Sequence, residues 1–248
     1  MPSGSLAAEK SSATAIAGNV LQFSGFSIKG VRRKANGDRY LNLTAPPLLV
    51  VADGISSSDA GAESAEACIN ALASGSNVLV ESKNRERALR QLLDDVNGKL
   101  LSRSLSMPNT ERRRGGCCVA GILVDWPQHR VIVFHAGDSA VFLVTDGKLK
   151  RLTKDHASAG NARSMRKARI RSAIGLVPSP EISISAVPLD RSLSLLIASD
   201  GCDDVLLEAL SQRGFDENSC DPEIEALVSG LSPQDDATAI LATVSPEA

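Results

Sequence analysis

The sequence predicts an antiparallel α+β fold, and three observations support this class. Many short apolar runs, bounded by turn residues, have the length and alternation of β-strands. Two longer segments carry apolar residues at helical spacing, and they follow one another without a strand between them. Helices do not alternate with single strands as they would in a parallel α/β fold, so most strands are expected to pair as hairpins.

The predicted elements follow in order along the chain. A flexible arm rich in Ser and Ala is expected at residues 1–18, and a single domain at 19–248, since no repeat or linker interrupts it. Hairpin turns are predicted at residues 125–128 and 146–147. Helices are predicted at 61–79 and 85–105, and shorter ones at 203–213 and 222–231. The predicted strands are 21–28, 39–43, 48–52, 118–124, 131–136, 141–145, 149–152, 182–187, 193–198 and 237–244.

Composition excludes several classes of protein. The 27 basic and 29 acidic residues nearly balance, which gives no general attraction to nucleic acid or to a membrane surface. No apolar run approaches the roughly 20 residues of a membrane span, and the N-terminus lacks the pattern of a secretory signal. The 5 cysteines form no CxxC pair and no Cys/His cluster, so neither zinc nor a disulfide framework is expected. We therefore expect a cytoplasmic protein.

Acidic residues stand where several predicted strands begin or end. Asp53 and Asp200 each follow an apolar run and precede a glycine, in LLVVADG (48–54) and LLIASDG (195–201). An unpaired carboxylate at the edge of a core is unfavourable unless a cation meets it. A sheet that gathered these acids would make a cluster that needs cations for its stability. The acids in such positions are Asp38, Asp53, Asp138, Asp200, Asp235 and Asp236.

A cluster of carboxylates without His or Cys predicts a site for hard divalent cations, Mg²⁺ or Mn²⁺. The glycine after each acid fits this prediction, because it lets the backbone approach a metal and offers a carbonyl ligand. A single Asp-Gly pair is usually only a turn. Its repetition after two matching apolar runs, at Gly54 and Gly201, favours a functional site.

Short motifs occur in a fixed order along the chain: VADG at 51–54, HAGDS at 135–139, TKDH at 153–156, SAIG at 172–175, ASDG at 198–201 and DDATAI at 235–240. GVRRKANGD at 30–38 precedes them, and GGCCVAGIL lies at 115–123. Each motif is short. Their order and spacing together resemble the metal-dependent Ser/Thr protein phosphatases of the 2C type (the PPM family) in their compact bacterial form, over residues 23–244.

The resemblance implies an α+β fold with four α-β-β-α layers, in which antiparallel helix pairs flank two antiparallel sheets. It also implies a site for two divalent cations, Mn²⁺ or Mg²⁺, at one end of the sandwich. By motif position Asp53 bridges both cations, Gly54 offers its carbonyl to one, and Asp200 and Asp235 hold the other. Arg33 binds the substrate phosphate, for which a guanidinium fork is suited.

Two further acids complete the implied ligand set. Asp138 matches the acid that contributes to a weaker third cation in bacterial members of the family. Asp38 ends a motif in which Gly37 replaces the family's usual glutamate, and we expect Asp38 to compensate as a metal ligand. Residues 55–58 carry no histidine that could act as general acid, so a water on the metal or Ser58 would take that role.

The implied reaction is hydrolysis of phosphoserine or phosphothreonine in a protein, by a water that two metal ions activate and without a phosphoenzyme. Arg33, Asp53 and Asp200 are the expected catalytic residues. One alternative is a pseudophosphatase that serves as a binding or regulatory module, which the glycine at position 37 and the changed segment 55–58 motivate. A two-metal enzyme for a small phosphoester or nucleotide shares the acids but not the motif order.

The expected partner is a phosphorylated protein, the target of a Ser/Thr kinase in bacterial signalling, and the chain is expected to be a monomer. Neither nucleic acid nor a membrane is expected to bind. The basic segment Arg163–Arg171 falls beside the site in the family. It is equally compatible with docking of an acidic or phosphorylated protein and with a solvated helix face.

Overall fold

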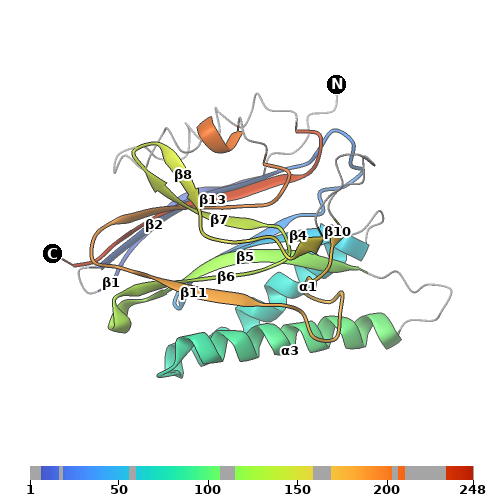
Figure 1. Ribbon diagram of the computed structural model, residues 1–248, viewed down its shortest axis with the longest axis horizontal. Coiled ribbons are helices and arrows are strands. Elements are labelled where there is room, and N and C mark those ends of the chain that lie inside the picture. Colours follow the sequence, from blue (N-terminus) through green and yellow to red (C-terminus); the bar gives the residue numbers. More distant parts are fainter. Residues whose placement is uncertain are drawn as a thin grey trace.

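The computed structural model describes residues 7–16, 19–55, 60–106, 115–158, 169–202, 206–209 and 233–247. In these residues the strands form two stacked antiparallel sheets, and helices α1 and α3 cover the outer face of one of them (Figure 1). The predicted antiparallel α+β class is confirmed.

The larger sheet has six strands in the order β1-β2-β13-β12-β7-β8. Part of the arm expected at residues 1–18 belongs to it, because β1 pairs with β2 along most of its length. The β7–β8 hairpin turns at Asp146 and Gly147, both with positive φ, as a tight two-residue hairpin turn requires. The strands are β1 (Ala7–Ile16), β2 (Asn19–Ile28), β13 (Ala237–Ser245), β12 (Leu193–Ala198), β7 (Ala140–Thr145) and β8 (Lys148–Arg151).

The second sheet has five strands in the order β11-β6-β5-β4-β3. A short 3₁₀ turn, Trp126–Gln128, joins β5 to β6 where a hairpin turn was predicted. Every predicted strand is present, with small differences at the ends, and the largest difference is that β4 continues to Ile55. The strands are β11 (Ser183–Pro188), β6 (Arg130–Ala136), β5 (Gly116–Asp125), β4 (Pro47–Ile55) and β3 (Arg39–Thr44), and β9 (Ala157–Ser158) and β10 (Arg169–Ile170) form a separate pair.

Strand β4 is buried on both faces, which explains its uninterrupted apolar sequence. Leu49 and Val51 belong to the core between the two sheets, whereas Leu48 and Val50 face the helices. Strand β12 of the other sheet is similar, since its alternate residues also join two different core clusters. The two matching apolar runs therefore lie on opposite sides of one sandwich interior.

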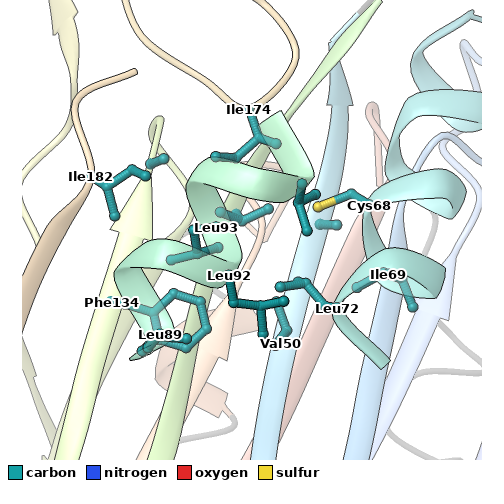
Figure 2. Close-up of a cluster of buried hydrophobic side chains, with 14 of the residues drawn as sticks. Val50, Cys68, Ile69, Leu72, Leu89, Leu92, Leu93, Phe134, Ile174 and Ile182 are labelled. Carbon is teal, nitrogen blue, oxygen red and sulfur yellow. The ribbon is translucent and has the colours of Figure 1, made fainter. Parts of the chain in front are cut away.

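The helices are α1 (Ala60–Gly75), α2 (Asn77–Glu81) and α3 (Arg85–Ser106). Figure 2 shows Leu72 of α1 and Leu93 of α3 among the buried side chains that pack on β4 and its neighbours. The single helix predicted at 61–79 is wrong in one respect, because the helix is interrupted at Ser76. Gly75 and Ser76 are weak helix formers, and the Ser76 hydroxyl donates to the carbonyl oxygen of Ala73 at 2.8 Å.

The two shorter predicted helices lie largely outside the described residues, apart from a helical turn at 206–209. Among the described helices, none is long and apolar enough to cross a membrane.

Candidate metal centre

Three of the predicted acids meet at one end of the sandwich. One carboxylate oxygen from each of Asp53, Asp138 and Asp200 lies within 4.8 Å of the other two. Asp53 stands in β4 of the five-stranded sheet, and Asp200 follows β12 of the six-stranded sheet. Asp138 lies in the turn from β6 to β7, where the chain passes from one sheet to the other. Elements from both sheets therefore build the cluster.

The cluster is electrostatically unfavourable without cations. Burial raises the pKa of Asp53 well above its usual value, and the charges of Asp38 and Asp200 raise it further. Burial also raises the pKa of Asp200, with the charge of Asp138 as the next cause. Divalent cations would remove this repulsion and allow all the carboxylates to ionise.

Asp38 lies deeper than the other acids, with a relative exposure of 3%. Burial raises the pKa of Asp38 to about 7, although hydrogen bonds from Ser199 and Thr238 oppose this shift. The negative charge of Asp236 raises it further. Asp38 thus adds to the negative charge around Asp53. Together, Asp38, Asp53, Asp138 and Asp200 are called the acidic centre below.

Two carboxylate oxygens in this region are buried and make no hydrogen bond among the described residues, namely Oδ2 of Asp38 and Oδ1 of Asp138. Buried polar atoms in native proteins almost always have a partner, and a bound ion is one way to supply it. With an all-oxygen donor set, these atoms fit hard divalent cations such as Mg²⁺ and Mn²⁺.

Both glycines of the repeated Asp-Gly pairs are required by close contacts. A Cβ on Gly54 would lie 2.5 Å from the carbonyl carbon and oxygen of Gly61 and 2.6 Å from the carbonyl oxygen of Gly37. A Cβ on Gly201 would lie 1.9 Å from the carbonyl oxygen of Asp236. The backbone at these two points is therefore packed too tightly for any side chain.

Arg33 and Asp235 bind each other, and Asp235 is not among the three carboxylates that converge within 4.8 Å. Arg33 Nε donates to Asp235 Oδ1 at 2.5 Å, and Arg33 Nη2 donates to Oδ2 at 2.8 Å. The hydrogen bond to Asp235 raises the pKa of Arg33, and the charges of Asp235, Asp236 and Asp53 add to it. The charges of Asp53 and Asp235 both stabilise the charged form of Arg33, so the guanidinium lies beside the acidic centre.

Asp236 was expected among the clustered acids, but the sequence assigned it no individual role. Its carboxylate accepts the backbone N–H of Gly30 at 2.8 Å and that of Gly37 at 2.7 Å. It is buried, with a relative exposure of 6%. The only signal in the sequence was its position as the second acid of DDATAI.

The turn that carries Asp138 rests on two stacked histidines, His135 and His156, whose ring centres are 4.4 Å apart. The backbone N–H of Gly137 donates to the ring atom Nδ1 of His156 at 3.3 Å, and the backbone N–H of His156 donates to the Gly137 carbonyl oxygen at 2.8 Å. His156 Nε2 lies 3.0 Å from the hydroxyl oxygen of Ser183. These contacts give His156 a structural role behind the cluster.

Two predicted features lie outside the described residues. These are Ser58, and the part of the basic segment from Arg163 to residue 168. The remainder of that segment enters β10, and the Arg171 N–H donates to the carbonyl oxygen of His156 at 2.9 Å. The end of the basic segment is thus attached to the histidine that supports the Asp138 turn.

Comparison with known proteins gives a family for this chain. Residues 34–244 match the model of the protein phosphatase 2C family. The serine/threonine phosphatase stp of Listeria monocytogenes is 27% identical over 188 residues, which are 70% of this chain and 73% of the relative. Protein phosphatase 2C homolog 2 of Saccharomyces cerevisiae is 32% identical over 135 residues, 52% of this chain and 27% of the relative.

Solved structures share the fold. The PPM Ser-Thr phosphatase MsPP from Mycobacterium smegmatis superposes with a TM-score of 0.69 at 19% identity, over 90% of this chain and 97% of that chain. The catalytic domain of the phosphatase PstP, in complex with 2 manganese ions, has a TM-score of 0.69 at 23% identity, over 92% and 99% of the two chains. The chain therefore belongs to the protein phosphatase 2C family, and it is a Ser/Thr protein phosphatase of the PPM type.

Proposed function

We propose that the chain removes phosphate from serine and threonine in a protein substrate at the acidic centre, with two divalent cations, Mn²⁺ or Mg²⁺, as cofactors. The convergence of Asp53, Asp138 and Asp200 oxygens within 4.8 Å carries this proposal. Three carboxylates at that separation repel one another unless cations lie between them. The manganese-bound structure of PstP supports the choice of metal.

Each acid has a proposed ligand role. Asp53 would bridge the two cations, with the Gly54 carbonyl on one of them and Asp200 and Asp235 on the other. Asp138 would contribute to a weaker third cation. Asp38 would act as a further ligand, which its buried and unpartnered Oδ2 supports.

Arg33 would bind and orient the phosphate through its fork of N–H groups. Because Asp235 accepts from Nε and Nη2 of Arg33, a phosphate that bound along the same edge of the guanidinium would displace Asp235. The bound cations would supply an activated water and neutralise charge on the phosphate. Asp53 and Asp200 would orient these cations, and the buried side chain of Cys118, which lies opposite Asp53 on β5, would exclude bulk water from one side.

The proposal also includes the finer features that the sequence suggested. One such feature is a four-layer α-β-β-α sandwich in which antiparallel helix pairs flank the two sheets. The division into an N-terminal segment at 1–18, whose strand β1 pairs with β2, and a catalytic domain at 19–248 belongs to the same proposal. So do a monomeric state, a cytoplasmic location and a substrate that is the target of a Ser/Thr kinase.

A second candidate is a pseudophosphatase that binds phosphoproteins without hydrolysing them. The observation that favours it is the closed ion pair of Arg33 and Asp235, in which a proposed phosphate ligand and a proposed metal ligand satisfy each other. The glycine at position 37 favours it too, because no carboxylate is present there.

The deciding experiment is hydrolysis of a phosphothreonine peptide with Mn²⁺, with Mg²⁺ and with chelator, for wild type and Asp200→Asn. Asp95→Asn, which changes an exposed acid on α3, is a matched control. We expect metal-dependent turnover that Asp200→Asn abolishes and Asp95→Asn retains. Turnover in chelator would refute the mechanism, and a folded, Mn²⁺-binding but inactive wild type would favour the pseudophosphatase.

A further inference from the structure

One carboxylate joins both ends of the loop that carries Arg33. The N–H groups of Gly30 and Gly37 donate to the two oxygens of Asp236, to Oδ1 at 2.8 Å and to Oδ2 at 2.7 Å. Arg33 lies between these glycines, and Asp38 directly follows the second. The two ends of the loop are thus attached to the segment that leads into β13.

Other contacts attach the same two segments. The Val31 N–H donates to the Pro233 carbonyl oxygen at 2.9 Å, and the Asp236 N–H donates to Asp235 Oδ1 at 2.8 Å. Oδ1 of Asp235 therefore accepts two hydrogen bonds, one from Arg33 Nε and one from the backbone N–H of Asp236. The ion pair of Arg33 and Asp235 and the anchor at Asp236 form one connected network.

A carboxylate suits this position better than an amide. Both of its oxygens are acceptors, and here they meet two backbone donors. Asparagine would offer one oxygen and one NH₂ group, so that one of the two N–H groups would face another donor. Hydrogen bonds to a charged acceptor are also stronger than neutral ones.

Gly37 and Asp236 also fit each other in space. A Cβ at position 37 would lie 3.2 Å from Asp236 Oδ2 and 3.8 Å from the carbonyl oxygen of Gly54. A methyl group there would press on the carboxylate that holds the loop. The absence of a side chain at position 37 therefore matches the presence of a carboxylate at position 236.

We propose that Asp236 is a positioning residue of the phosphatase reaction, which places Arg33 for the phosphate and Asp38 for the cations by holding both ends of their loop. This inference rests on the proposed function. In this role Asp236 acts through the loop, to which both of its oxygens are bound, and not as a ligand of substrate or metal. A merely structural anchor would change stability without changing how the folded protein binds phosphate.

The test compares Asp236→Asn with Asp125→Asn. Asp125 is a matched control, because it is also buried and bound by two partners, Arg85 and Arg130, but it lies at the opposite end of β5 from the site. We expect Asp236→Asn to raise the KM for a phosphothreonine peptide about tenfold, as loss of one hydrogen bond to a charged group predicts. Asp125→Asn should lower stability and leave KM unchanged.

Two measurements do not need turnover. Amide exchange by NMR should become faster at Gly30 and Gly37 in Asp236→Asn. Binding of inorganic phosphate to the Mn²⁺-loaded protein, followed by calorimetry, should weaken by a similar factor. If wild type fails to hydrolyse the peptide, the proposed function fails, whereas the phosphate affinities of wild type and variant still decide the role of Asp236.

A folded Asp236→Asn variant with wild-type phosphate affinity would overturn the proposal, and so would wild-type KM in an active enzyme. If that variant does not fold, Gly37→Ala replaces it, because it keeps the carboxylate and presses a methyl group against it. The same weakening of phosphate affinity is then expected, and an unchanged affinity overturns the proposal.

Discussion

The guanidinium of Arg33 contacts the carboxylate of Asp235 at two points, with Nε 2.5 Å from Oδ1 and Nη2 2.8 Å from Oδ2. One partner is the proposed ligand of the phosphate, and the other is a proposed ligand of a cation. A cation that binds Asp235 must compete with Arg33 for the same oxygens. Cation binding and release of the arginine for phosphate are therefore coupled.

Arg33→Ala is expected to affect metal and substrate in opposite directions. Removal of the competing guanidinium should tighten Mn²⁺ binding, while the loss of a charged phosphate ligand should raise the KM for a phosphopeptide about 10- to 100-fold. Calorimetric titration with Mn²⁺ and steady-state kinetics measure the two effects. Arg87→Ala on the exposed face of α3 is the control. Weaker Mn²⁺ binding by Arg33→Ala would contradict the coupling.

Asp200→Asn is expected to reduce turnover by at least about a hundredfold, because the cations contribute several kcal/mol to the reaction. The same change should stabilise the metal-free protein, since it removes one of three repelling carboxylates. Urea unfolding in chelator and in Mn²⁺ tests this. Wild type should gain stability from Mn²⁺, and the variant should gain much less. Equal gains for both would rule out Asp200 as a ligand.

Asp38 predicts a pH dependence of stability in the metal-free protein. Its folded-state pKa of about 7 lies above the unfolded value of 3.8, so the folded state keeps a proton that the unfolded state has lost. Stability should therefore fall as pH rises from about 4 to about 7, with a contribution of at most about 1.4 kcal/mol per pH unit. Denaturant titrations of wild type and Asp38→Asn in chelator measure the difference, which should disappear below pH 4. A difference that grows as pH falls would have the wrong sign.

Gly54→Ala should destabilise the protein by about 1–3 kcal/mol or more, because its methyl group would overlap the backbone of Gly61 and Gly37. Gly98→Ala is a matched control within α3, where a Cβ meets nothing within 4 Å. That change should stabilise by about 0.5–1 kcal/mol, as expected for alanine in a helix. Thermal unfolding compares the two, and a neutral Gly54→Ala would show that the backbone there can move.

Much of the fold follows from local pattern. Strands such as β12 could be located because they are apolar runs bounded by turn residues. Helix α3 could be located because apolar residues recur at helical spacing over residues 85–105. The acids could be assigned to one site because they end or begin such strands. Strands β1, β9 and β10 were missed, because β1 is rich in polar and small residues and the other two are only two residues long. The break at Ser76 was also missed, since a polar residue at one point leaves the helical period unchanged.

The contacts inside the site could not be predicted from pattern. The pairing of Arg33 with Asp235 joins residues more than 200 positions apart, and it depends on how two irregular loops are placed. The role of Asp236 depends on the same placement. Irregular loops carry no periodic signal, so the sequence identified the acids but not which of them would bind a cationic side chain or a backbone N–H group.

Asp53 lies within strand β4, opposite Cys118 of β5 in the ladder of hydrogen bonds. Because side chains alternate along a strand, Asp53 continues the row of Leu49 and Val51 that faces the interior between the sheets. An insertion of one residue before Asp53 would turn its carboxylate toward the helices, even if every other residue of the site were kept. The pairing of β4 with β5 thus fixes the direction of the Asp53 carboxylate. A slip in the register of β4 would remove that carboxylate from the site as completely as its mutation.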